Sequence, residues 1–123
     1  MNEEEAQALL NDWHYLYIGM SKVLPEFKGF TDLGDSTRGI TYYHYKYIKN
    51  PYCPRYIYWG EIVINSRLKS NWRIKAVLWH EFCHHWAYSV YNYSGHQGTF
   101  DKCLRTDKKL WLLGSLGRII PMF

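Results

Sequence analysis

The segment His80-Glu81-Phe82-Cys83-His84 constrains this chain more than any other feature of its sequence. Histidines four residues apart lie on one face of an α-helix, with their Cβ atoms about 6 Å apart. At that spacing both imidazoles can bind the same metal ion. The motif therefore predicts a helix here, and a metal bound to it needs further ligands from elsewhere in the chain.

Glu81 lies about 100° around this helix from His80 and about 60° from His84, so it is poorly placed to be a third ligand. Its carboxylate can instead accept a proton from a water that the metal holds. A zinc ion with three protein ligands leaves its fourth position to such a water and lowers the pKa of that water to about 7. The pattern predicts a hydrolytic site with Glu81 as the general base. The alternative is a buried helix whose two histidines bind backbone or carboxylate groups.

The predicted third ligand is His96, which follows Ser94 and Gly95. After His84 the helix continues for about 10 Å away from the metal, and a turn at Gly95 would let the chain reverse and bring His96 back. Asp101 is the alternative third ligand, unless it only stabilises the first turn of the next helix. Three imidazoles suit zinc, with manganese and iron as alternatives.

Length and composition predict one globular domain over residues 1–123. Hydrophobic residues make up 47% of the chain and aromatic residues 19%, which excludes a disordered polymer. The net charge of +4 is compatible with an acidic partner but is not diagnostic of nucleic acid. No apolar run reaches the about 20 residues that span a bilayer, and the acidic start lacks the pattern of a secretion signal, so no membrane partner is expected.

The three cysteines, Cys53, Cys83 and Cys103, are odd in number and form no C-x-x-C pair. They predict neither a disulfide framework nor a four-cysteine zinc ribbon. We expect reduced thiols in a cytoplasmic protein, or a nuclear one in a eukaryote, with Cys83 filling the core.

Helical periodicity and caps predict three helices. The first begins after Asn2 and ends near Gly19 to Ser21, and the second covers Asn71 to Tyr91 after a cap at Ser70. The third, which Thr99 could cap, runs to about Leu113, with Gly114 just past its end. The histidines outside the motif are expected to be structural or packing residues; they are His14, His44 and His85.

Two segments rich in tyrosine, threonine and isoleucine, residues 38–48 and 55–65, predict an antiparallel hairpin with a turn at 49–54. Residues 26–37 read mostly as a loop because they contain Gly29, Gly34 and Asp35. Strands placed between helices indicate an α+β fold, with helices packed on a short, mainly antiparallel sheet. An extended peptide could bind along the edge of that sheet.

The metal motif resembles the SprT-like metallopeptidase domain, the family that includes the Spartan proteases. The similarity lies in His80–His84, in the 11 residues between His84 and His96, and in the run Gly95–Phe100. That run is similar to the family's Gly-His-Gly-x-x-Phe segment, although its second glycine falls one residue later, at Gly98. Gly60–Leu68 resembles the family's strand before the metal helix, so the similarity covers Arg38 to Leu113.

This resemblance implies a small zincin-like metalloprotease domain that binds Zn²⁺ through His80, His84 and His96 and uses Glu81 as general base. It also implies a protein or peptide substrate, and members of the family are associated with proteins bound or crosslinked to DNA. Many members carry a C-terminal cysteine zinc ribbon or another DNA-binding appendage, and we expect none in residues 1–123. DNA as a partner is therefore a weaker expectation than protease chemistry.

Two other functions fit the same residues. One is a nucleic-acid-binding module with a structural metal, suggested by the positive charge and the aromatic hairpin. A structural zinc usually has four protein ligands, and the sequence offers three good ones. The other is a non-catalytic scaffold on a protease fold, against which the presence of Glu81 argues.

Overall fold

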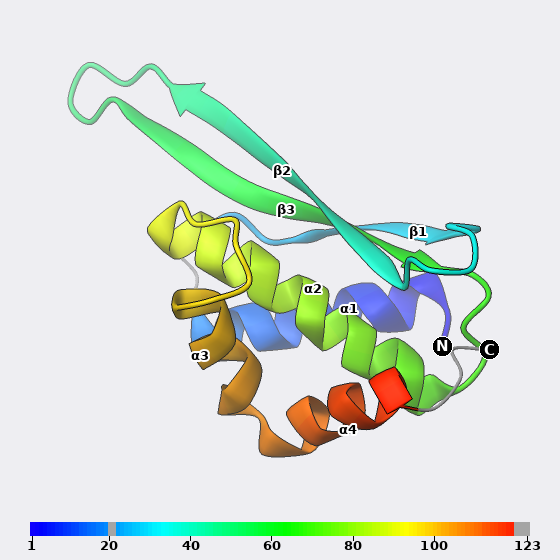
Figure 1. Ribbon diagram of the computed structural model, residues 1–123. Coiled ribbons are helices and arrows are strands. Elements are labelled where there is room, and N and C mark those ends of the chain that lie inside the picture. The colour runs from blue at the N-terminus through cyan, green and yellow to red at the C-terminus, as the bar shows by residue number, and fades with distance from the viewer. Residues whose placement is uncertain (20–21, 120–123) are drawn as a thin grey trace.

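The computed structural model describes residues 1–19 and 22–119, and in these residues four helices pack on one three-stranded sheet (Figure 1). This is the α+β class that the sequence predicts. The elements follow in the order α1 (Glu3–Tyr17), β1 (Glu26–Thr31), β2 (Gly39–Ile48), β3 (Arg55–Asn65), α2 (Asn71–Tyr91), α3 (Thr99–Thr106) and α4 (Lys108–Ile119).

The sheet is mixed, with strand order β1-β3-β2. β2 pairs antiparallel with β3, which confirms the predicted hairpin, but β1 pairs parallel with β3. The prediction of a loop at residues 26–37 is thus wrong for Glu26–Thr31. Gly29 adopts a φ of 146° where the register shifts between Phe27 and Gly29. β1 forms because β3 offers it a partner and because its two phenylalanines pack against the core. The sequence of so short a segment reveals neither the strand pairing nor this packing.

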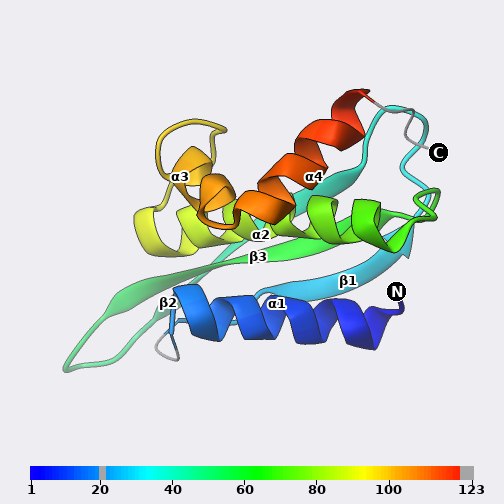
Figure 2. The same ribbon diagram turned by 90° about the horizontal axis from the view of Figure 1, so that it is seen from below.

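The helices form two layers below the sheet. α2 packs on β3 and β2, α1 packs on β1 and α2, and α3 and α4 pack on α2 away from the sheet (Figures 1 and 2). Trp79 and Phe82 of α2 are fully buried and stacked, with ring centroids 5.5 Å apart, and Trp13 of α1 meets Trp79 edge-on at 5.1 Å. Each such buried side chain contributes about 1.5–3 kcal/mol. α2 is therefore held on several sides and is a rigid support for the histidine motif.

The start of α1 and the span of α2 agree with the sequence. α1 ends at Tyr17, before the predicted end near Gly19 to Ser21, of which residues 20–21 lie outside the described part of the chain. Ser70 precedes α2 as predicted, but its side chain makes no capping hydrogen bond within the described residues. The Asn2 side chain accepts a hydrogen bond from the Glu5 amide, and α2 covers the predicted residues before ending at Asn92 in the left-handed conformation. The predicted third helix is two helices, because Asp107 is extended and its carboxylate caps α4 at the Leu110 amide. α4 continues through Gly114, which was expected to end it.

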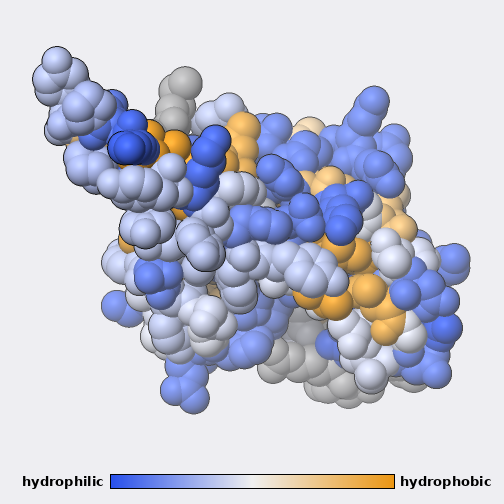
Figure 3. All heavy atoms as spheres, turned by 90° about the horizontal axis from the view of Figure 1, so that it is seen from above, coloured by the Kyte–Doolittle hydropathy of each residue, from blue (hydrophilic) through white to orange (hydrophobic). Residues whose placement is uncertain are grey.

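The β2–β3 hairpin continues past the last turn of α2 (Figures 1 and 3). We call this part of the hairpin, residues 44–59, the arm. Tyr45 pairs with Tyr58 and Tyr47 pairs with Tyr56, so these four side chains share one face of the arm. Their rings contact one another, with centroids 5.0 Å apart for Tyr47 and Tyr56. Tyr52 in the turn is 96% exposed. In Figure 3 the arm projects at the upper left and is coloured mostly in shades of blue.

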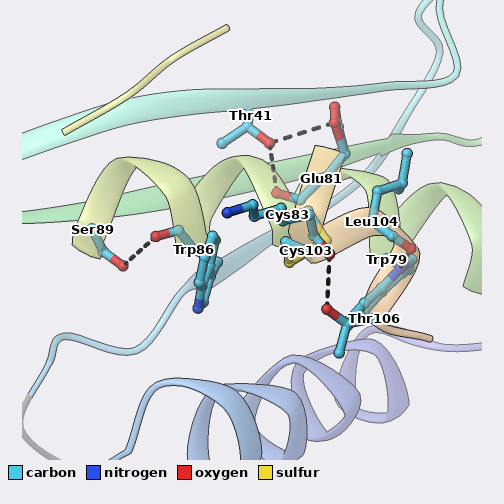
Figure 4. The surroundings of a disulfide bond; sticks show 10 residues. Thr41, Trp79, Glu81, Cys83, Trp86, Ser89, Cys103, Leu104 and Thr106 are labelled. Carbon is cyan, nitrogen blue, oxygen red and sulfur yellow. Dashed lines mark hydrogen bonds between the residues drawn. A yellow bond between two sulfur atoms is a disulfide. The ribbon is translucent and has the colours of Figure 1, made fainter. Parts of the chain in front are cut away.

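Cys83 and Cys103 form a disulfide between α2 and α3 (Figure 4). Their Cα atoms are 5.5 Å apart, and Cys53 is the free, exposed cysteine. The expectation of reduced thiols is therefore wrong for this pair, and Cys83 is more than a core filler. Sequence spacing could not reveal it because the two cysteines come from helices whose packing creates the contact. Within residues 1–19 and 22–119, the structure contains no helix with the length and apolar character that crossing a bilayer requires.

His14 of α1 and His85 of α2 form a buried hydrogen-bonded pair. The Gly60 amide donates to His85 Nδ1 at 2.8 Å, which leaves the proton of that ring on Nε2. His85 Nε2 then donates to His14 Nδ1 at 3.2 Å, and His14 Nε2 donates to the Lys22 carbonyl at 3.1 Å. Burial lowers the pKa of both rings, to about 3 for His85. Both imidazoles are neutral, and they connect α1 to α2 and β3.

Candidate metal centre

Three imidazoles meet at the side of α2 that faces α3. His80 and His84 come from successive turns of α2, and His96 comes from the loop between α2 and α3. One ring nitrogen from each lies within 4.8 Å of the other two. His84 is 6% exposed, His80 is intermediate and His96 is exposed, so the group opens toward solvent on the His96 side. The three residues that the sequence selected as ligands are thus brought together.

The donor set fits a tetrahedral metal after a small contraction. Zinc–nitrogen bonds of about 2.0–2.1 Å place ligand nitrogens about 3.4 Å apart. The nitrogens therefore have to approach by no more than about 1.4 Å, which small side-chain rotations can supply. Phe100 packs against all three rings, with centroid distances of 4.2 Å to His84, 4.9 Å to His80 and 5.2 Å to His96. This phenylalanine is 2% exposed and gives the group an apolar wall.

His84 is neutral, as a metal ligand must be. Burial, followed by the neighbouring His80 and His96, lowers the pKa of His84 to about 3. Its Nδ1 lies 3.2 Å from the hydroxyl of Tyr43 on β2. With Nδ1 occupied in this way, Nε2 is the nitrogen left for a metal.

Glu81 is buried between α2 and the start of β2 (Figure 4). Thr41 donates to the Glu81 carbonyl at 3.2 Å and lies 3.5 Å from its carboxylate Oε2. Gly39 leaves the carboxylate room, since a Cβ at that position would lie 3.1 Å from Glu81 Cγ. Burial raises the pKa of Glu81 to about 8, with the Thr41 hydrogen bond acting in the opposite direction. A cation bound nearby would lower this pKa and favour the carboxylate.

A cleft of about 1020 Å³ lies beside two of the three histidines and Glu81. His80, Glu81 and His96 line it together with Phe100. The cleft is also lined by residues before and at the start of β2 and by side chains of α2 and α4; among these are Thr37, Gly39, Trp72 and Trp111. The volume is large enough for several residues of an extended peptide.

The other candidates from the sequence lie outside the histidine group. Asp101, the alternative third ligand, accepts a hydrogen bond from Arg105 at 3.0 Å on α3. His44 stacks on Trp59 on the arm, with ring centroids 5.5 Å apart. Thr41 and Tyr43 were missed because threonine and tyrosine are ordinary strand residues and only the pairing of β2 places them over α2. The sequence signal that could have identified them is their position: two polar residues at alternate positions of one strand point to the same face of the sheet.

Compared with protein-family models, curated proteins and solved structures, the chain matches none of them. The evidence for its chemistry is therefore the geometry of the site itself. That geometry supports a three-histidine group able to hold a metal ion.

Proposed function

We propose that this protein is a zinc-dependent metallopeptidase of the SprT-like type. The observation that carries the proposal is the convergence of His80, His84 and His96, two of which line the same cleft as the buried carboxylate of Glu81. Three imidazoles with one side open to solvent match a catalytic zinc site, which keeps a position for water, better than a closed structural site. The resemblance to the SprT-like family, seen in the same residues, points the same way.

A bound zinc ion would acidify a water and polarise a substrate carbonyl. Glu81 would then serve as the proton carrier, accepting a proton from the attacking water and donating it to the leaving amine. A general base works best when its pKa lies near the working pH, and the burial of Glu81 moves its pKa upward from the ordinary carboxylate range. Thr41 donates to the Glu81 carbonyl, and its hydroxyl oxygen lies 3.5 Å from the carboxylate Oε2, which limits the directions in which the carboxylate can point.

The proposed substrate is a polypeptide in extended conformation. Among residues 1–19 and 22–119, β2 pairs with β3 alone, and Gly39 at the start of β2 lines the cleft, so a peptide could add to this edge as a further strand. Proteins bound or crosslinked to DNA are the substrates that the family resemblance suggests. The cytoplasmic location stays a prediction, and the Cys83–Cys103 disulfide is a feature that is rare in that compartment.

Removal of the metal tests this function directly. We expect purified protein to contain about one zinc per chain, to digest casein, and to lose that activity when dialysed against a chelator. Zinc added back restores the activity, because the three histidines are already assembled around Phe100. Metal analysis and gel-based digestion measure the two quantities. Chelated protein that cuts at the rate of the parent would rule out metal catalysis.

The arm favours a second candidate function, binding of single-stranded nucleic acid. No acidic residue occurs between Asp35 and Glu61, whereas Lys46, Lys49 and Arg55 lie on the arm. Its tyrosines are solvent-accessible, at 67% for Tyr45, 49% for Tyr47 and 54% for Tyr56. Alternation along the strands places Lys46 and Arg55 on the face opposite the tyrosines, with Lys49 in the turn. The arm thus offers rings that could stack nucleobases on one face, and basic side chains that could hold phosphates on its other face and at its tip.

We expect the protein to bind labelled oligothymidylate, with an affinity that falls as salt rises. Three phosphate contacts would give a slope of about −2 for log K against log salt. Changing Tyr45, Tyr47 and Tyr56 together to serine should weaken binding by at least 10-fold, since each stacked base contributes about 1–3 kcal/mol. Tyr15→Ser on α1, also at an exposed tyrosine, is the control. Equal binding by the triple variant and the control would exclude the arm as the binding site for single-stranded nucleic acid.

A further inference from the structure

The hydroxyl of Tyr43 contacts both His84 and the loop that carries His96. It lies 3.2 Å from His84 Nδ1 and donates to the Ser94 carbonyl at 3.3 Å. A phenol has one proton, and a carbonyl oxygen can only accept. The Tyr43 hydroxyl therefore donates to Ser94, and its oxygen accepts the proton of His84 Nδ1.

This arrangement determines the tautomer of His84. A proton held on Nδ1 leaves the lone pair of Nε2 free for a metal. Hydrogen bonds of this kind orient a metal-bound histidine and raise its basicity, and carboxylates or backbone carbonyls usually supply them. Here a tyrosine from the sheet takes that role.

The same hydroxyl also holds the loop that carries His96. Ser94 is two residues before His96, in a segment without regular secondary structure. The loop has one other tyrosine contact, in which the Gln97 amide donates to the Tyr93 hydroxyl at 3.2 Å. Tyr43 ties this loop to β2, while its ring packs on Tyr88 of α2 at a centroid distance of 4.6 Å. One side chain thus connects the strand, the helix and the loop around the site.

We propose that Tyr43 is a positioning residue of the metal centre, which fixes the tautomer of His84 and the place of the His96 loop through one hydroxyl. The inference rests on the proposed metal site and concerns metal binding, not the cleavage step. It predicts that the hydroxyl contributes to zinc affinity although it does not touch the metal.

Tyr43→Phe removes the hydroxyl and keeps the ring on Tyr88. We expect zinc affinity, measured by competition with a chromophoric chelator, to fall 10- to 100-fold, the usual effect of losing such a partner. Tyr58→Phe is the matched control, since its ring also packs on Tyr88, at 5.3 Å, from the neighbouring strand. The control should bind zinc like the parent. Equal affinities for Tyr43→Phe and Tyr58→Phe would overturn the proposal.

A measurement on the unaltered chain keeps the proposal testable even if Tyr43→Phe does not fold. Long-range ¹H–¹⁵N spectra of the metal-free protein should show His84 protonated on Nδ1. If the spectra show His84 protonated on Nε2 instead, Tyr43 does not fix the tautomer of His84, and the proposal is refuted. The two hypotheses separate cleanly, because a parent that binds no zinc contradicts the metallopeptidase, whereas a parent that binds zinc with His84 in the wrong tautomer contradicts only the role of Tyr43.

Discussion

Glu81→Gln is expected to abolish measurable peptide cleavage while leaving the metal site intact. Glutamine keeps the shape of the side chain and its contact with Thr41 but cannot accept a proton. General-base catalysis contributes about 10²–10⁴ in rate, so kcat should fall by that factor. Zinc content should stay at the parent value, since Glu81 is not one of the three grouped ligands. Digestion of casein alongside metal analysis checks both parts.

Glu61→Gln is the matched control for this change. Glu61 is partly buried on β3, where its carboxylate lies 3.7 Å from Lys28 and from His44. The control should cleave at the parent rate. A Glu81→Gln protein that digests casein as fast as the parent would show that another group takes the proton, and a fully metal-loaded parent without activity would favour the scaffold alternative.

Loss of the Cys83–Cys103 disulfide is the largest expected effect on stability. The two cysteines are separated by 20 positions, and closing a loop of that length in the unfolded chain accounts for about 3 kcal/mol. The Cys83→Ala, Cys103→Ala double variant should therefore lower the melting temperature by about 10 °C. Calorimetry measures the shift. Part of it will come from lost packing, because both cysteines belong to the buried core.

Reduction of the parent separates the bond from the packing. A reducing agent breaks the disulfide but keeps both sulfur atoms in the core. It should therefore cause most of the decrease in melting temperature in the parent, and it should not change the melting temperature of the double variant. Cys53→Ser, at an exposed free cysteine, should melt like the parent. If reduced and oxidised parent melt together, the disulfide does not form in the protein.

Much of the candidate site follows from local sequence. The helix over Asn71–Tyr91, the spacing of His80 and His84 and the return of the chain near Gly95 all depend on neighbours within a few turns. The hairpin was predictable for the same reason, since its strands are adjacent in sequence and joined by a short turn. Local patterns carry this information because helix periodicity and turn chemistry are short-range properties.

The parts that could not be predicted depend on tertiary contact. β1 exists because β3 pairs with it in parallel, and the break between α3 and α4 reflects an extended Asp107 that also caps α4. The contact of Tyr43 with His84 spans 41 positions and requires β2 to lie over α2. No pattern in a single sequence predicts a contact between such distant positions, because propensity and periodicity describe only the segment in which they occur.

The hydrogen bonds through His14 and His85 run in one direction only, because the Gly60 amide can only donate and the Lys22 carbonyl can only accept. An additional proton on either ring would break this sequence of bonds. Above about pH 6.5 both rings are neutral in the folded and unfolded chain alike, and their contribution is fully present. As the pH falls from there, the unfolded chain takes up protons that the folded chain refuses. For His85 this loss of stability continues toward pH 3, at up to about 1.4 kcal/mol per pH unit, and the lowered pKa of His14 acts in the same direction. The acid tolerance of the fold is thus limited by two imidazoles that take no part in its proposed chemistry.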